Sequence, residues 1–292
     1  GVTGASPTYQ WSRGSSAISG ATSSSYTLVQ ADVGSIMSVV ITYTDDLTSS
    51  NTITLTAASD VDNVNDAGSG LSLASDGDVA DPDEDDALSV TGTLADEDGV
   101  TGASPTYQWS RGSSAISGAT SSSYTLVQAD VGSIMSVVIT YTDDQTESNT
   151  ITLTAASNTD NVNDAATASI SGTATEDETL TASAADEDGV TSASYTYVWN
   201  RAGTAISGAT SSTYILTQDD VGSAITVTIS FSDDLGGTET PTSSATSAVA
   251  NVNDDPSGSV TVTGTAQEDE VLGIATSQMS DEDGLGTFSY QW

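Results

Sequence analysis

The stretch that decides the fold is YQWSRGSSAISGATSSSY, residues 107–124, because the chain contains it three times. Residues 9–26 repeat it without a change, and residues 197–214 repeat it as YVWNRAGTAISGATSSTY. Its tryptophan and the last residue of the chain form a series: Trp11, Trp109, Trp199 and Trp292. Successive members are 98, 90 and 93 residues apart, a length at which a unit can bury its own small core and repeat end to end. The chain is therefore an array of tandem domains.

Within each repeat, apolar and polar residues alternate with a period of two, which indicates β-strands. Residues 225–231 alternate Ile, Val, Ile and Phe with hydroxyl residues, and residues 37–43 alternate Met, Val, Ile and Tyr with Ser, Val and Thr. Further strands are predicted at residues 53–57, 151–155 and 197–199, which are rich in the types that half-buried sheets prefer. No segment shows the apolar stripe of a helix. The pattern predicts an all-β chain, a tandem array of Ig-like (cadherin-like) β-sandwich domains.

The repeat also predicts the domain boundaries. Residues 1–46 recur unchanged as residues 99–144, which indicates recent duplication within a longer array. Because the sequence begins and ends inside a repeat, we expect it to be a segment of a much longer polypeptide. We expect part of a repeat over 1–62, complete repeats over 63–160 and 161–250, and the first part of a further repeat over 251–292.

The composition excludes several classes of partner. The chain has 41 Asp and Glu residues against three Arg, no His and no Cys, and a net charge of −38. Such a charge repels nucleic acid and anionic membrane surfaces, so we expect neither as a partner. The absence of Cys excludes disulfides, and no apolar run approaches the ~20 residues that span a bilayer. Regularly spaced aromatic and aliphatic residues argue against disorder.

The residue types also argue against catalysis. Nucleophilic triads need a His, Lys or equivalent base, and phosphate chemistry generally uses Lys, Arg or a Gly-rich loop at a helix start. A carboxylate pair for glycoside hydrolysis stays open, because Asp and Glu are abundant. Every acidic cluster recurs, however, which favours a structural role over a single active site. We therefore expect that the chain is not an enzyme.

The three cations occupy one equivalent position, two residues after each repeated tryptophan: Arg13, Arg111 and Arg201. We expect each to form a structural salt bridge, with ligand recognition as the alternative. The acids before each Val-Gly are predicted to be acceptors that form turns: Asp32, Asp130 and Asp220. Pairs of acids after the alternating strand, Asp45-Asp46, Asp143-Asp144 and Asp233-Asp234, fit either turn chemistry or a further ligand role.

The order of motifs resembles the immunoglobulin fold. A tryptophan strand is followed by Tyr-x-Leu after Ser or Thr, then Asp-Val-Gly, then a long alternating strand, which is similar to strands C, E and F. The resemblance implies that the tryptophan is the buried centre of the sandwich. Two features depart from antibody-type domains: no Cys pair flanks the tryptophan, and the tyrosine-corner position is Ile36, Ile134 or Ala224.

Three acidic elements recur in a fixed order. A linker, Asn-Val-Asn-Asp, occupies 63–66, 161–164 and 251–254, and resembles the linker of cadherin-like repeats. An acidic pair follows at 84–85, 176–177 and 268–269, and then an acidic loop, Asp-Glu-Asp-Gly, at 96–99, 186–189 and 281–284. The combination is similar to the tandem extender repeats of giant bacterial adhesins of the RTX type, secreted by type I systems. That resemblance implies an extracellular location at a bacterial cell surface.

The resemblance also implies calcium ions at the domain junctions. Calcium prefers six to eight oxygen ligands at ~2.3–2.6 Å from carboxylates, amides and carbonyls, which the three elements offer. Zinc, copper and haem are disfavoured because His and Cys are absent. The candidate ligands are Asn63, Asn65, Asp66, Glu84, Asp85, Asp96, Asp98, Asn161, Asn163, Asp164, Glu176, Asp177, Asp186, Asp188, Asn251, Asn253, Asp254, Glu268, Asp269, Asp281 and Asp283.

We expect each linker to meet the acidic pair and the acidic loop that follow it, at one pole of the sandwich. In an extended Asp-x-Asp, alternate side chains share a face, so both Asp should face the ion and the middle Glu should face away. The alternative is that the acids are solvated surface, as suits a protein from a marine or saline habitat.

The function expected is that of a structural extender in a very long bacterial cell-surface adhesin. Calcium would rigidify the rod, which would project a distal binding domain, and the partners would be neighbouring repeats of the same chain. The alternative is a repeat unit of a self-assembling extracellular filament or surface-layer protein. A carbohydrate-binding module is disfavoured, because its exposed aromatics are not expected here: Tyr9, Tyr107 and Tyr197 are in phase with the tryptophans and should point inward.

Overall fold

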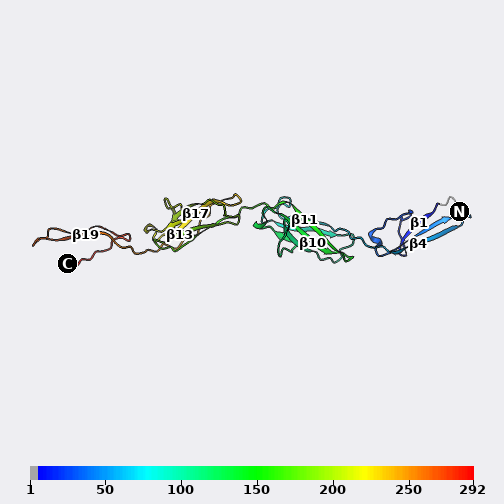
Figure 1. Cartoon of the computed structure of the whole chain (residues 1–292), viewed down its shortest axis with the longest axis horizontal. Coiled ribbons are helices and arrows are strands. Elements are labelled where there is room, and N and C mark those ends of the chain that lie inside the picture. Colours follow the sequence, from blue (N-terminus) through cyan, green and yellow to red (C-terminus); the bar gives the residue numbers. More distant parts are fainter. Residues whose placement is uncertain (1–5) are drawn as a thin grey trace. The chain divides into compact units, whose positions relative to one another are not determined.

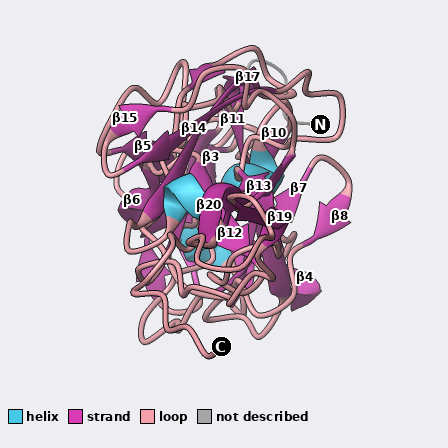
Figure 2. Cartoon of the chain, turned by 90° about the vertical axis from the view of Figure 1, so that its left-hand side faces the viewer, coloured by secondary structure: helices cyan, strands magenta, loops and turns pink. Residues whose placement is uncertain are grey.

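The computed structural model describes residues 6–292, and the chain divides into two compact units, Gly1–Asn161 and Val162–Trp292. The described residues form antiparallel sheets and contain no α-helix; the helical segments in Figure 2 are short 3-10 turns. No helix among them is long and apolar enough to cross a membrane. The finer division into four repeats stays a prediction, and its first five residues lie outside the described part. The 3-10 turns are η1 (Gln30–Asp32), η2 (Gln128–Asp130) and η3 (Gln218–Asp220).

The second repeat, in the first unit, is a sandwich of two antiparallel sheets. One sheet has the order β5-β6-β9 and the other β11-β10-β7-β8, with β10 and β11 side by side in Figure 1. The strands are β5 (Ser69–Ser75), β6 (Ala87–Ala95), β7 (Thr106–Arg111), β8 (Ser114–Ala115), β9 (Ser123–Thr125), β10 (Ile134–Thr142) and β11 (Ser148–Asn158). The three-plus-four arrangement agrees with the Ig-like sandwich predicted from the sequence.

Trp109 is the centre of this sandwich, as the repeated motif predicts. Its side chain is 0 % exposed, pairs across the sheet with Val137, and stacks on Tyr124 at a ring distance of 5.8 Å. Its indole N–H donates to the carbonyl of Ser121 at 2.9 Å, so the one polar atom of the side chain is satisfied. Alternate residues of β10 and Leu126 complete the core. The period of two therefore buries one face of the strand.

The first repeat is described as a single sheet with the order β2-β1-β3-β4. Its strands are β1 (Thr8–Arg13), β2 (Ser16–Ala17), β3 (Ile36–Thr44) and β4 (Ser50–Asp60). Leu28 is 51 % exposed, whereas Leu126 at the same repeat position is 0 % exposed. The difference arises because the sequence contains no counterparts of β5 and β6 for this repeat.

The third repeat, in the second unit, is a sandwich of the same kind. Its sheets have the orders β12-β13-β16 and β15-β14-β17-β18, around Trp199 and Leu180. Its strands are β12 (Thr167–Ser171), β13 (Thr179–Ala185), β14 (Thr196–Arg201), β15 (Thr204–Ala205), β16 (Thr213–Ile215), β17 (Ile225–Ser232) and β18 (Thr238–Glu239). The strand predicted at 225–231 is confirmed as β17.

The last part of the second unit is a hairpin of β19 (Ser257–Thr263) and β20 (Gly273–Ser280). Trp292 lies outside any strand and its side chain is 79 % exposed, although the repeated motif predicts that the tryptophan is the buried centre of a sandwich. In the other repeats the tryptophan strand pairs with the long alternating strand, as β14 does with β17. The sequence contains no such partner for Trp292.

The third repeat has two ends, separated by the eight residues of β17, about 26 Å of strand. At the incoming end the linker meets the acidic loop, where the Asp164 N–H donates to Asp188 at 3.0 Å. At the outgoing end Thr175 and Ala250 form a parallel bridge, and the Glu176 N–H donates to the Ala250 carbonyl at 2.9 Å. Acidic side chains are present at both ends.

Candidate metal sites

The acidic pair lies at the outgoing end of its own repeat, not beside the linker that precedes it. In the third repeat, β12 carries the chain away from the incoming end, and Glu176 then lies next to Ala250. In the second repeat the Glu84 N–H likewise donates to the Asp160 carbonyl at 2.9 Å. The expected meeting of each linker with the acidic pair that follows it is therefore wrong, because a whole strand separates the two, whereas the expected meeting with the acidic loop is confirmed.

A cluster of carboxylates forms at the outgoing end of the third repeat. One carboxylate oxygen from each of Glu176, Asp254 and Glu282 lies within 4.8 Å of the others. Glu176 is 2 % exposed, and the linker accommodates it by donating the Val252 N–H to its Oε2 at 3.2 Å. The buried Oδ2 of Asp254 has no hydrogen-bond partner within residues 6–292. The cluster thus gathers three carboxylates, and Asp254 contributes to it an oxygen that is free to accept.

The cluster changes the acidity of its linker residue. Burial raises the pKa of Asp254, and the negative charges of Asp283 and Asp177 raise it further. A cation among these oxygens would remove the repulsion that causes the second part of this shift.

Glu282 belongs to the cluster, although the middle residue of the acidic loop was expected to face away. The loop is a turn: the Asp283 N–H donates to Asp281 Oδ1 at 3.0 Å, and the Gly284 N–H donates to the Asp281 carbonyl at 3.1 Å. In a turn, alternate side chains do not share a face as they do in a strand. The expectation fails for that reason.

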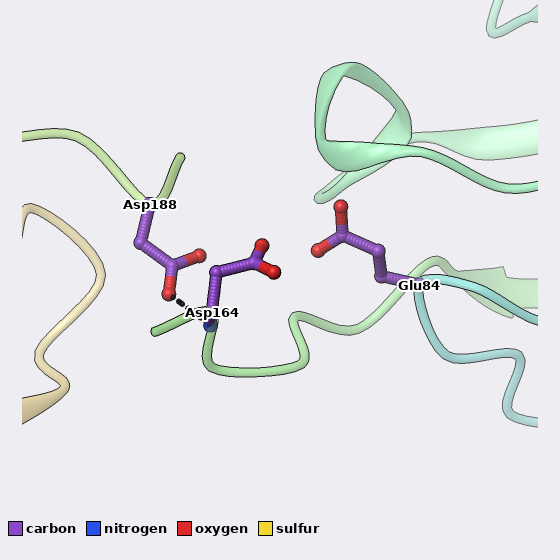
Figure 3. Close-up of side chains that lie close together, drawn as sticks. All are labelled: Glu84, Asp164 and Asp188. Atoms are coloured by element: carbon purple, nitrogen blue, oxygen red, sulfur yellow. Dashed lines mark hydrogen bonds between the residues drawn. The ribbon is translucent and has the colours of Figure 1, made fainter. Parts of the chain in front are cut away.

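The last Asp of each acidic loop positions a linker. Its Oδ2 accepts the backbone N–H of the last linker residue, which is drawn for Asp164 and Asp188 in Figure 3. The same bond recurs from Asp66 to Asp98 and from Asp254 to Asp283, each at 2.9 Å. Within the described chain the second oxygen of Asp98, Oδ1, is buried and has no hydrogen-bond partner. One oxygen of Asp98 therefore fixes the linker, while its other oxygen remains available to a ligand.

The other predicted ligands are dispersed. Asp85, Asp177 and Asp269 are exposed and have φ angles of 64° to 68°, so these acids form left-handed turns that Asp tolerates. Glu268 is exposed as well, between β19 and β20. Most linker Asn side chains bond nearby groups: Asn63 accepts from Gln30, Asn65 donates to Asn149, Asn163 donates to Glu239, Asn251 donates to Asp283 and Asn253 donates to the Asp254 carbonyl. Asp186 lies at the incoming end, away from Glu176.

The arginines form the salt bridges that the sequence predicts. Arg111 Nε donates to Asp130 Oδ1 and Arg201 Nε to Asp220 Oδ1, both at 2.7 Å, and Arg13 contacts Asp32 at the same distance. These Asp side chains are fully buried. Asp220 also accepts the Thr217 N–H at 2.9 Å and the Tyr214 hydroxyl at 2.8 Å. The predicted turn-forming role of these acids is confirmed.

This salt bridge predicts a dependence of stability on pH. Burial acts to raise the pKa of Asp220, but the hydrogen bonds from Arg201 and the Thr217 amide outweigh it and lower the pKa below its ordinary value. A carboxyl whose pKa is lowered by folding stabilises fully above its unfolded pKa, about 4, and loses this contribution as pH falls through the folded pKa. The difference in melting temperature between the parent and Asp220→Asn should therefore narrow below about pH 4, measured in chelator. A difference that stays constant down to pH 2 would contradict this.

No protein-family model matches the sequence, and no curated protein matches it. Among similar solved structures is a Ca2+-stabilized adhesin that helps an Antarctic bacterium reach out and bind ice. It shares 16 % identity with a TM-score of 0.29, over 90 % of this chain and 69 % of that chain. A 1.5-MDa bacterial ice-binding adhesin shares 14 % sequence identity with a TM-score of 0.27, over 86 % of this chain and 88 % of that chain. The three N-terminal domains of the outer capsid protein Hoc of bacteriophage RB49 share 14 % sequence identity with a TM-score of 0.25, over 84 % of this chain and 88 % of that chain. Each likeness is one of fold.

Proposed function

We propose that the chain is a structural extender segment, in which calcium fastens one Ig-like repeat to the next. The observation that carries the proposal is the composition of the cluster at the outgoing end. Glu176 comes from the third repeat, Asp254 from the linker, and Glu282 from the acidic loop of the following repeat. A single cation bound there would join three segments that are separate in the sequence. Calcium fits because all three ligands are carboxylates.

Electrostatics supports a cation in this place. Two full charges 4.8 Å apart, the upper separation within the cluster, repel by roughly 3 kcal/mol at an effective dielectric constant of 20. The chain has only three cationic side chains, and each contacts an Asp outside this cluster. Without a bound cation the repulsion would favour separation of the linker from Glu176. With calcium it would favour a closed, stiff junction.

The finer part of the proposal concerns the whole protein. The segment would lie in a very long adhesin at a bacterial cell surface and hold a distal binding domain away from the cell. Its direct partners would be neighbouring repeats of the same chain. One similar structure is described as Ca2+-stabilized, which is a property of that adhesin; calcium is proposed for the present chain on its own carboxylates.

Calorimetry with calcium on the 292-residue chain tests the proposal, with Glu176→Gln as the variant. Glu176→Gln should weaken one class of calcium sites at least tenfold, because it replaces a charged ligand with a neutral one. The control is Glu178→Gln, two residues away, whose exposed side chain lies outside the cluster. Equal calcium binding by the parent and both variants would overturn the site.

Small-angle scattering tests the mechanical part. The scattering profile of the parent should change from a flexible to a stiffer chain when calcium replaces chelator, and Glu176→Gln should reduce the change. A profile that does not respond to calcium would remove the stiffening role. Ordered bundles in electron micrographs would instead favour the self-assembling filament or surface-layer protein.

A further inference from the structure

A second carboxylate cluster lies at the incoming end of the third repeat. One oxygen from each of Asp186, Asp233 and Glu239 lies within 4.8 Å of the others. Asp186 belongs to the acidic loop, Asp233 follows β17, and Glu239 ends β18. The cluster is therefore built within one repeat and shares no residue with the cluster at the outgoing end.

The second repeat shows the same place with its acids satisfied by hydrogen bonds. Its equivalents of Asp186 and Asp233 are Asp96 and Asp143. The Tyr141 hydroxyl donates to Asp96 Oδ2 at 2.5 Å, and the Asn149 amide donates to Asp143 Oδ2 at 2.7 Å. Asp143 is buried and Asp96 is half-buried, and each has a neutral donor for the oxygen that the turn leaves unused.

The third repeat lacks both of these donors. Phe231 replaces the tyrosine and has no hydroxyl, and Glu239 replaces the asparagine and adds a third negative charge. As a result Asp186 Oδ2 and Asp233 Oδ2 are buried and find no hydrogen-bond partner in the described residues. Asp233 is only 6 % exposed, so water does not readily substitute for the missing donor. An unpaired buried carboxylate oxygen is expensive, and here two lie beside a third carboxylate.

Neighbouring groups fix these carboxylates in place. Asp233 Oδ1 accepts the backbone N–H groups of the following turn, from Leu235 at 2.8 Å and from Gly237 at 3.0 Å, which confirms its turn chemistry. Glu239 accepts the Asn163 amide at 2.8 Å and the Ala166 N–H at 3.2 Å. Asp233 and Glu239 are therefore held by fixed donors, while Asp186 and Asp233 each keep one oxygen without a partner among the described residues.

A third substitution leaves room beside the free oxygens. The second repeat has Glu147 where the third has Gly237. A Cβ atom at Gly237 would collide with both Asn163 Oδ1 and Asp233 Oδ2, so these two oxygens converge where only glycine leaves space. The amide oxygen of Asn163 is thus a fourth candidate ligand.

We propose that the third repeat binds a divalent cation of the calcium class through Asp186, Asp233, Glu239 and the Asn163 amide oxygen. The ion takes the place of the two hydrogen-bond donors that stabilise the second repeat. The ligand chemistry is appropriate, because oxygens on one calcium ion lie within about 5 Å of one another and calcium accepts carboxylates and amides together. The carboxylates at this place are therefore stabilised by hydrogen-bond donors in the second repeat and by a bound ion in the third.

Exchange of the donors between repeats tests this site on the 292-residue chain. Phe231→Tyr with Glu239→Asn gives the third repeat the donors of the second. This double variant should bind one calcium ion fewer than the parent in calorimetry, with the affinity of the remaining sites within about twofold. Its melting temperature should respond less to chelator. An unchanged number of bound ions would overturn the proposal.

The reciprocal exchange distinguishes the loss of a site from simple misfolding of the first variant, because it should create a site. Tyr141→Phe, Glu147→Gly and Asn149→Glu give the second repeat the residues of the third, and should add one bound calcium ion. Glu176→Gln, at the outgoing end, should act additively with the Phe231→Tyr and Glu239→Asn exchange, because the clusters share no ligand. If the exchange and Glu176→Gln abolish the same single binding event, the incoming-end site does not exist. Titration with magnesium alone serves as the comparison for cation size.

Discussion

Replacement of Trp199 by Ala should lower the free energy of unfolding of the third repeat by about 3 to 5 kcal/mol. The side chain is fully buried, packs against both sheets of the sandwich and satisfies its own N–H through the Ser211 carbonyl at 2.9 Å. Its loss would leave a large cavity between the two sheets, around which the packed core relaxes only in part. A domain of this size has only about 5 to 15 kcal/mol of stability, so partial unfolding at moderate temperature is expected.

The matched control is Trp292→Ala. Trp292 occupies the same repeat position but is largely exposed and lies outside any strand, so its removal should change stability by less than about 0.5 kcal/mol. Urea unfolding followed by circular dichroism measures both variants. Equal midpoints for Trp199→Ala and the parent would show that the third repeat does not depend on its tryptophan.

Asp220→Ala should destabilise the third repeat by about 3 kcal/mol. The substitution removes one acceptor that serves Arg201, the Tyr214 hydroxyl and the Thr217 N–H at once. Breaking a buried ion pair costs about 3–5 kcal/mol, and the lower end applies because 28 % of the Arg201 side chain still reaches water. The 3-10 turn η3 should also loosen, since Asp220 accepts the backbone donor at its start.

Asp219→Ala is the matched control for Asp220→Ala. Asp219 is the neighbouring acid and lies 3.8 Å from Arg201, but its side chain is 84 % exposed. An exposed pair contributes little, so we expect a change of less than about 0.5 kcal/mol. Thermal unfolding of both variants in chelator separates this salt bridge from calcium binding. Similar losses for the two variants would contradict the importance of the buried acceptor.

Much of the fold could be predicted from the sequence because the strand pattern is local. The alternation of residues 225–231 requires only that one face be buried, and that face holds Ile225 and Phe231. The pairing of Arg201 with Asp220 was also open to prediction, since both recur at fixed positions in every repeat. The repeats of this chain can be compared with one another, and that comparison shows which positions recur.

The grouping of the acids could not be predicted in the same way, because it depends on topology and on turns. The end at which Glu176 lies depends on the hydrogen bond from its N–H to the Ala250 carbonyl, more than 70 residues later in the chain. The direction of Glu282 depends on the turn that Asp281 forms. The sequence prediction assumed instead that Asp-x-Asp is extended.

Two acids of the incoming-end cluster carried only weak signals. Asp233 fitted either turn chemistry or a further ligand role, and Glu239 belongs to no motif. The signal that could have found them is the difference between repeats. The third repeat has Phe231 in place of Tyr141 and Glu239 in place of Asn149, while it keeps both Asp residues that these side chains serve in the second repeat.

The parallel bridge between Thr175 and Ala250 decides how the third repeat carries tension. A pull on the two termini of this repeat draws the segment around Thr175 towards its N-terminus and the segment around Ala250 towards its C-terminus. In a parallel pair these forces oppose each other along the strands. The two flanking bonds, from the Ala250 N–H to the Ala174 carbonyl and from the Glu176 N–H to the Ala250 carbonyl, both 2.9 Å long, are therefore sheared together rather than opened in sequence. Glu176 donates one of these two hydrogen bonds. An ion bound by its carboxylate would therefore reinforce the repeat at its outgoing end, where the pull from the next repeat is applied.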